Sequence, residues 1–247
     1  MPVCDMHEGS GEALSRRALV VGALVSLIGF LTLTLVVTRH GTDGVDCAAR
    51  TLVHRPSHRA LQSSMEAVSF AAGRPGQAAV VCLGATLLRR RGRWAVGLPL
   101  VMAGAGILQG VAKWAVDRPR PNLDPWDFPS AHVLTVVVLF GYLAYVLATS
   151  RTRRNVGVVL SAVIVCAVAF SRMYLDAHWL SDVAGGFAMG LAYLLGAIWL
   201  LGSQWDQSAR SRNDESSCGP IHTQKQRTHT SSRMAATESG PTSSVNG

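Results

Sequence analysis

The sequence contains little charge for its length, and its few cysteines follow no recognisable pattern. Only 15% of the 247 residues are Asp, Glu, Lys or Arg, whereas 49% are hydrophobic, which excludes an ordinary soluble domain of this size. The five cysteines have neither metal-ligand spacing nor the arrangement of a disulfide framework. Lysine is nearly absent, since Lys113 is the only one before Lys225. The composition therefore indicates an integral-membrane protein.

Long apolar runs take the place of the missing charge. A helix needs roughly 20 residues to cross a bilayer core, and five runs approach this length: 18–37, 94–116, 133–149, 156–170 and 183–201. A sixth, weaker run at 76–88 needs part of 61–73, from which Arg74 and Pro75 separate it. Because the runs are continuous and lack the alternation of strands, we expect an all-α polytopic membrane protein, a bundle of six transmembrane helices.

Arginines gather in alternate connections of this bundle, before the first run and in two later loops: Arg16, Arg17, Arg89, Arg90, Arg91, Arg93, Arg151, Arg153 and Arg154. Cytoplasmic loops carry an excess of Lys and Arg, so both termini are predicted to be cytoplasmic. No aromatic residues are interleaved with the arginine runs, which argues against a nucleic-acid partner despite the net charge of +8. We predict a cytoplasmic segment at 1–17, a six-span domain at 18–202, and a disordered cytoplasmic tail at 203–247, where bulky apolar residues are scarce.

Two polar stretches, 113–132 and 171–182, fall in connections on the opposite, extracytoplasmic face of the predicted bundle. Charge at membrane depth costs several kcal/mol unless it is paired or functional. The sequence therefore predicts a candidate active site at the extracytoplasmic end of the bundle.

His178 and Asp182 are four residues apart, which would place them on one face of a helix. A carboxylate in this position can fix the imidazole tautomer and leave the other nitrogen free to act as a nucleophile. The same pair is also compatible with a helix end that is only capped and solvated.

Three cations, Lys113, Arg120 and Arg172, are predicted at the same face. An ammonium and two guanidinium groups suit a multiply charged anion such as a phosphate. Each cation alone could instead extend to lipid headgroups.

The segment 128–133, FPSAHV, adds directional groups to this face. Ser130 is expected to be the N-cap of the fourth span, where its hydroxyl could cap the helix or bind a phosphate. His132 could protonate a leaving oxygen, or could be an interface residue.

These residues resemble the three-part signature of the type-2 phosphatidate phosphatase (PAP2) superfamily of membrane lipid phosphatases. The three parts are Lys113-x6-Arg120-Pro121, Pro129-Ser130-Ala131-His132 and Ser171-Arg172-x5-His178-x3-Asp182, within a motif core at about 60–202. The chain departs from the signature at Ala131, where the family usually has glycine.

The resemblance implies a role for each matching residue. His178 would be the nucleophile that forms a phosphohistidine, Asp182 would orient it, and His132 would act as acid and then base. Phosphate binding would fall to Lys113, Arg120, Ser130, Ala131 and Arg172, and no metal or other cofactor would be required.

We therefore expect a membrane hydrolase of lipid phosphates or diphosphates, in the bilayer of the cell membrane, with undecaprenyl diphosphate as the leading substrate. Phosphatidate or phosphatidylglycerol phosphate are alternative substrates, and a lipid phosphotransferase is an alternative reaction. Other classes are a metalloenzyme using His132, His178 and Asp182, a vanadate-dependent oxidase, and a non-catalytic lipid-binding protein. The sequence leaves the oligomeric state open.

Overall fold

The structure is a computed structural model that describes residues 8–55, 59–116, 118, 121, 128–148 and 150–217. Within these residues the chain is helical and contains no strand, in agreement with the predicted all-α class. The helices are α1 (Glu8–Thr38), α2 (Asp43–Val53), α3 (Arg59–Ala71), α4 (Arg74–Leu88), the short 3-10 helix η1 (Arg89–Arg91), α5 (Arg93–Ala115), α6 (Ala131–Leu147), α7 (Arg151–Tyr174) and α8 (Leu180–Ser217).

Four of these helices, α1, α5, α7 and α8, are long and apolar enough to cross a membrane. Helix α6 is apolar but has only 17 residues, and α3 and α4 are separate helices of 13 and 15 residues. The predicted interruption at Arg74 and Pro75 is present, because α4 begins at Arg74 with a proline in its first turn. The predicted count of six spans is not confirmed by these helix lengths.

Helix α6 lies at the centre of the packing. Its buried side chains include Val133, Leu134, Leu139 and Tyr142. Helices α1 and α7, in contrast, have many apolar side chains that are exposed. This is the pattern expected where a bundle faces lipid and its innermost helix contacts only protein. The fold therefore supports a multi-pass membrane protein.

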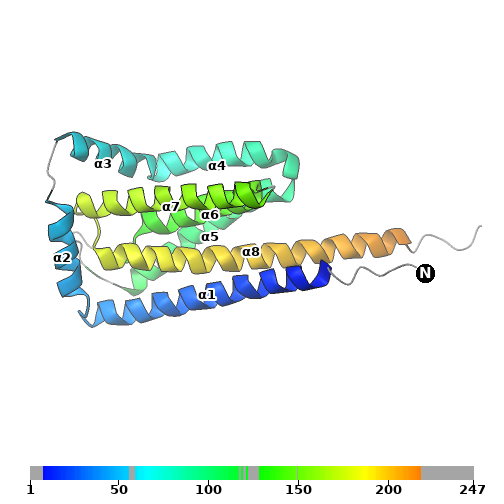
Figure 1. The fold of residues 1–247 in the computed structure, drawn as a ribbon, viewed down its shortest axis with the longest axis horizontal. Helices are drawn as coiled ribbons and strands as arrows, with labels where there is room; N and C mark the ends of the chain where they lie inside the picture. The colour runs from blue at the N-terminus through cyan, green and yellow to red at the C-terminus, as the bar shows by residue number, and fades with distance from the viewer. Residues whose placement is uncertain are drawn as a thin grey trace, which may run out of the picture. The chain divides into compact units, whose positions relative to one another are not determined.

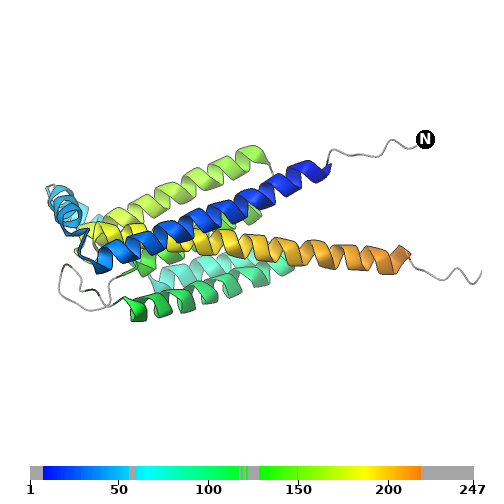
Figure 2. The same cartoon turned by 90° about the horizontal axis from the view of Figure 1, so that it is seen from below.

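The helices of residues 1–201 run back and forth between two ends (Figures 1 and 2). One end holds the start of α1, η1 and the α6–α7 connection, where the sequence has its clusters of arginine. The other end holds α2, the end of α5, the start of α6 and the α7–α8 connection. Both polar stretches that were predicted to form a site thus begin or end at this second end.

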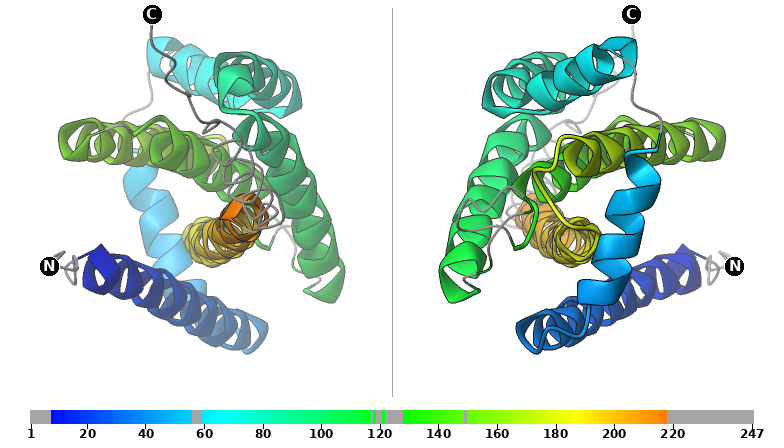
Figure 3. Two further views of the ribbon diagram at one scale, coloured as in Figure 1. Left: turned by 90° about the vertical axis from the view of Figure 1, so that its right-hand side faces the viewer. Right: turned by 90° about the vertical axis from the view of Figure 1, so that its left-hand side faces the viewer.

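Two helical segments were not expected. Helix α2 lies across the second end of the bundle (Figure 3), although its sequence was interpreted as a loop. Helix α8 continues to Ser217, so residues 203–217 are helical rather than disordered as predicted. These fifteen residues contain neither glycine nor proline and include Gln, Ala, Arg and Glu, which favour helix even without apolar side chains. Residues 218–247 of the predicted tail lie outside the described residues.

Candidate active site

Close packing of α6 against α8 brings the two polar stretches together. The amide of Ser130 donates a hydrogen bond of 2.9 Å to the carbonyl of Asp182, just before α6 begins. Gly186 of α8 lies so near that a Cβ at this position would be 2.5 Å from the Ser130 carbonyl oxygen. Any side chain there would force the helices apart. Glycine in α8 therefore sets the distance between the segments that carry His132 and His178.

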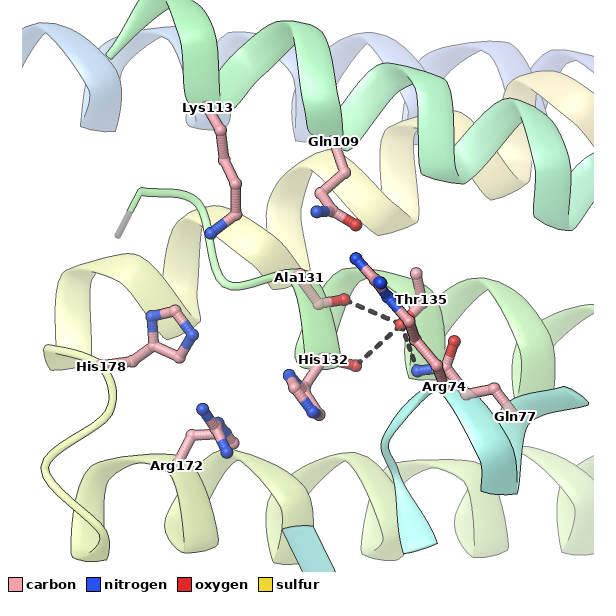
Figure 4. A pocket seen from close by; sticks show the side chains of 9 residues that line it. All are labelled: Arg74, Gln77, Gln109, Lys113, Ala131, His132, Thr135, Arg172 and His178. Atoms are coloured by element: carbon pink, nitrogen blue, oxygen red, sulfur yellow. Dashed lines mark hydrogen bonds between the residues drawn. The ribbon is translucent and has the colours of Figure 1, made fainter. Parts of the chain in front are cut away.

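A pocket of about 350 Å³ opens where these segments meet, and five of the predicted site residues line it: Lys113, Ala131, His132, Arg172 and His178 (Figure 4). They come from different elements. Lys113 is in the last turn of α5, His132 is in the first turn of α6, Arg172 is in the last turn of α7, and His178 follows α7. Residues up to 65 positions apart in the sequence thus share one cavity with several cationic groups.

His178 does not lie on a helix with Asp182, as the four-residue spacing suggested. Helix α8 begins at Leu180, so His178 is in the irregular segment before it, with 3% of its surface exposed. One Asp182 oxygen, Oδ2, accepts a hydrogen bond of 2.8 Å from the Trp179 amide. This is the return bond of a capping box, which satisfies an otherwise orphaned amide at the helix start. The carboxylate therefore fixes the chain immediately after His178.

Three predicted residues are not among those that line the pocket. Ser130 is the N-cap residue of α6, but its hydroxyl does not cap the helix. Instead Oγ is fully buried and has no hydrogen-bond partner within the described part of the chain. Buried hydroxyls are usually satisfied, so this one fits a group that accepts or donates only when a ligand is bound. Asp182 is buried behind the pocket, and Arg120 lies outside the described residues.

Helix α3 holds the end of α7 in place. The Arg172 guanidinium donates a hydrogen bond of 2.5 Å to the Ser69 hydroxyl, and the Ser171 hydroxyl donates one of 2.8 Å to the Met65 carbonyl. Both bonds join segments about a hundred residues apart in the sequence. Arg172 therefore enters the pocket from a position that α3 fixes.

Four further residues line the pocket that the sequence analysis did not assign to the site: Arg74, Gln77, Gln109 and Thr135. The Gln77 amide donates to the Thr135 hydroxyl (2.6 Å) and to the Ala72 carbonyl (2.7 Å), which ties α4 to α6. Gln109 could have been found, because it precedes Lys113 by four residues on α5 and so shares its helix face. Arg74 was recognised only as part of a helix break.

Directly behind the pocket lies a group of hydrogen-bonded side chains, here named the Arg118 cluster: Asp46, Arg118, Ser181 and Asp182. The Arg118 guanidinium donates to Asp182 Oδ1 and to Asp46 Oδ2, both at 2.8 Å, and to the Ser181 hydroxyl at 2.6 Å. Asp46 in turn accepts bonds from the amide and the hydroxyl of Ser181, at 2.9 and 2.7 Å. The cluster thus joins α2 to the start of α8.

The carboxylate of Asp46 stays ionised in this setting. Burial alone would raise the pKa of Asp46, but hydrogen bonds from Arg118 and Ser181 outweigh burial and leave the pKa below its usual value.

The described residues contain no group of three or more His, Cys, Asp or Glu that could hold a metal ion. His132, His178 and Asp182 do not form such a group.

Comparison with known proteins places part of the chain near a known family. Residues 94–206 match the family model described as the PAP2 superfamily. Residues 94–206 thus resemble a PAP2 superfamily domain. Over 124 residues the chain is 32% identical to phosphatidylglycerophosphatase B of Bacillus subtilis. This alignment covers 45% of this chain and 61% of that protein. The chain is also 30% identical over 130 residues to lipid phosphate phosphatase delta of Arabidopsis thaliana, covering 44% of this chain and 31% of the plant protein.

Two solved structures share the fold of this chain. The transmembrane PAP2-type phosphatidylglycerolphosphate phosphatase of Bacillus subtilis superimposes with a TM-score of 0.67 at 21% identity, covering 76% of this chain and 96% of that one. LpxE of Aquifex aeolicus superimposes with a TM-score of 0.52 at 15% identity, covering 62% and 93%. At these identities the likeness concerns the fold, and the chain spans less than two thirds of the length of both curated relatives above.

Proposed function

We propose that this protein is an integral-membrane phosphatase of lipid phosphates or diphosphates, with His178 as its nucleophile. One observation supports the proposal most strongly. Lys113, His132, Arg172 and His178, which come from four separate segments, line one pocket at the end of a membrane-type bundle. Cations around two imidazoles suit the charge of a phosphoryl group in transfer.

The proposed reaction has two steps. A nitrogen of His178 attacks the phosphorus atom, the bond from phosphorus to the lipid oxygen breaks, and His132 gives a proton to the departing oxygen. Water then attacks the phosphohistidine while His132 accepts a proton from it, which releases inorganic phosphate and restores His178.

The remaining predicted residues would assist these steps. Lys113, Arg120, Arg172, the Ser130 hydroxyl and the Ala131 amide would bind the phosphate oxygens. Asp182 would position His178 and stabilise its charge. The unsatisfied Ser130 hydroxyl favours this assignment, because a phosphate oxygen would provide the partner that it lacks among the described residues.

The topology that we propose has six crossings, formed by α1, α3 with α4, α5, α6, α7 and α8. Helices α3 and α4 follow one another along the bundle, so that together they extend between its two ends (Figure 1). Both termini would be cytoplasmic and the pocket extracytoplasmic, because arginine gathers at the opposite end.

Isoprenoid diphosphate remains the leading substrate in this proposal, with phosphatidylglycerol phosphate and phosphatidate as alternatives. The Bacillus relative is named as a phosphatidylglycerophosphatase, so phosphatidylglycerol phosphate is the substrate that its name gives. A lipid phosphotransferase would use the same phosphohistidine with an acceptor other than water.

The decisive experiment is His178→Ala in the full chain, purified in detergent. We expect phosphate release to fall by a factor of roughly 10³ or more, together with loss of the labelled phosphoenzyme that acid quenching should trap in the native protein. His54→Ala is a matched control, because His54 stacks on Tyr174 outside the pocket. Normal turnover by the His178 variant would refute the mechanism, and no phosphate release from any lipid by the native protein would favour the non-catalytic alternative.

A further inference from the structure

One end of the pocket is lined by side chains that the two-step reaction does not use. In Figure 4, His178, Lys113 and Arg172 lie toward one end of the pocket, whereas Arg74 and Gln109 lie toward the other, with His132 between them. The lining of the pocket therefore extends beyond the residues that the two-step reaction uses.

Arg74 and Gln109 are available as hydrogen-bond donors. Within the described residues neither side chain makes a hydrogen bond or an ion pair, whereas the Gln77 amide is already bonded to Ala72 and Thr135. None of the described residues that line the pocket is acidic. A guanidinium and a carboxamide without a neighbouring carboxylate suit an anionic group of the ligand.

The position of Arg74 in the chain supports this interpretation. Arg74 is the first residue of α4, at the interruption between two apolar helices. Interrupted helices in membrane proteins occur where they border a cavity. The interruption therefore places the cation Arg74 in the lining of the pocket.

An apolar groove of about 340 Å³ begins at the same end of the pocket. Gln77 lines both cavities, and the groove continues between α3, α4, α6 and α7 along Ala72, Val80, Val136 and Phe140. Its lining is almost entirely hydrocarbon, so it fits the chain of a lipid and not a headgroup. His178, Arg74 and the apolar groove thus follow one another in this order.

We propose that Arg74 and Gln109 form a subsite for a second phosphate group of the substrate, located between the phosphate attacked by His178 and the hydrocarbon chain. The inference rests on the proposed phosphatase function and narrows its substrate class. Isoprenoid diphosphate and phosphatidylglycerol phosphate both carry such a second phosphate, whereas phosphatidate carries only one. The protein therefore favours lipids that contain two phosphates.

The test compares kcat/KM for isoprenoid diphosphate, phosphatidylglycerol phosphate and phosphatidate in the full-length protein. For Arg74→Gln we expect a loss roughly 10-fold or more greater on the two-phosphate lipids than on phosphatidate, as for a lost hydrogen bond to a charged group. If only one of the two lipids shows the excess loss, then that lipid is the one whose second phosphate binds the subsite. Arg39→Gln, a change at an exposed arginine outside the pocket, should alter no ratio.

Gln109→Leu provides a second variant on a different helix, and it should shift the same ratio in the same direction by a smaller factor. Equal losses on all three lipids in both variants, or no loss in either, would overturn the subsite while leaving the phosphatase function intact. If the native protein released phosphate from none of the lipids, the proposed function itself would fail.

Discussion

In the Arg118 cluster one guanidinium contacts two carboxylates, whereas none of the described residues that line the pocket is acidic. The cluster satisfies its own charges with hydrogen bonds of 2.6 to 2.9 Å and is nearly closed to solvent. The pocket brings Lys113, Arg74 and Arg172 together around two imidazoles. The cluster thus compensates its own charges, whereas the charged side chains among the described residues that line the pocket are cationic.

The difference indicates which region holds the fold and which binds a ligand. Ion pairs that are buried and fully hydrogen-bonded leave little to gain from an added ligand, and removing one partner leaves a buried charge uncompensated. Cations that share a cavity repel one another, and an anion offsets this repulsion. We expect substitutions in the pocket to change activity and substitutions in the cluster to change stability.

The largest effect should come from the pocket. Lys113→Ala is expected to lower kcat/KM by roughly 10²- to 10³-fold, because it removes one preorganised positive group from the phosphoryl transition state. The melting temperature should change little, because Lys113 is proposed to act on the bound phosphate. Phosphate release and thermal unfolding, measured on the same detergent preparation, check both parts.

Lys113→Arg is the matched variant, since it keeps the charge but exchanges a compact ammonium for a planar fork. It should recover only part of the lost activity. A melting temperature that falls by many degrees in Lys113→Ala would contradict the assignment of the pocket as a ligand site without a structural role.

The second effect concerns the cluster. Asp46→Asn should destabilise the protein by roughly 3 kcal/mol, because Arg118 loses the charge of one of its two carboxylate partners in a buried site. Activity of the molecules that remain folded should fall less than in Lys113→Ala, since Asp46 acts on His178 only through the start of α8. Denaturation in detergent gives the stability change, and initial rates give the activity.

Asp43→Asn is the control for this change. Asp43 is 3.8 Å from Arg118 but more than half exposed, and exposed pairs contribute little. An equal loss of stability in Asp43→Asn and Asp46→Asn would show that burial in the cluster has no special role.

Much of the pocket could be predicted from the sequence because the chemistry is local to short motifs. Lys113, His132, Arg172 and His178 were selected for residue type and spacing, and topology then required their connections to share one end of the bundle. The helix assigned to His178 and Asp182 was wrong, because a spacing of four residues does not reveal where α8 begins.

The Arg118 cluster could not be predicted in the same way. Asp46 lies more than seventy residues from Arg118 in a segment without long apolar runs, and nothing in its neighbourhood indicates burial. Its partner is known only once α2 is seen to lie across the end of the bundle. The helical extension of α8 was also missed. The prediction of disorder rested on the scarcity of bulky apolar residues and did not consider the helix propensity of Gln, Ala and Arg.

The smallest expected effect distinguishes the buried cluster from an ion pair at the surface. Asp176 accepts hydrogen bonds of 2.7 and 3.0 Å from Arg50, and these lower the pKa of Asp176 below its usual value of 3.8. A lowered pKa in the folded state stabilises the protein above the usual value, and this contribution is lost as the pH falls through the lower, folded value. Asp176→Asn should therefore reduce the melting temperature slightly at pH 7, and this loss should shrink as the pH falls below 3.8.

Asn is the suitable replacement, because Asp176 has φ of 50° and asparagine tolerates this left-handed conformation better than most residues. Arg50→Gln should reproduce the same small loss from the other side of the pair, with the same decrease in acid. Both changes should be smaller than Asp46→Asn at every pH, since solvent screens a half-exposed pair. A pH-independent loss in Asp176→Asn would instead assign its effect to the backbone of the turn that precedes His178.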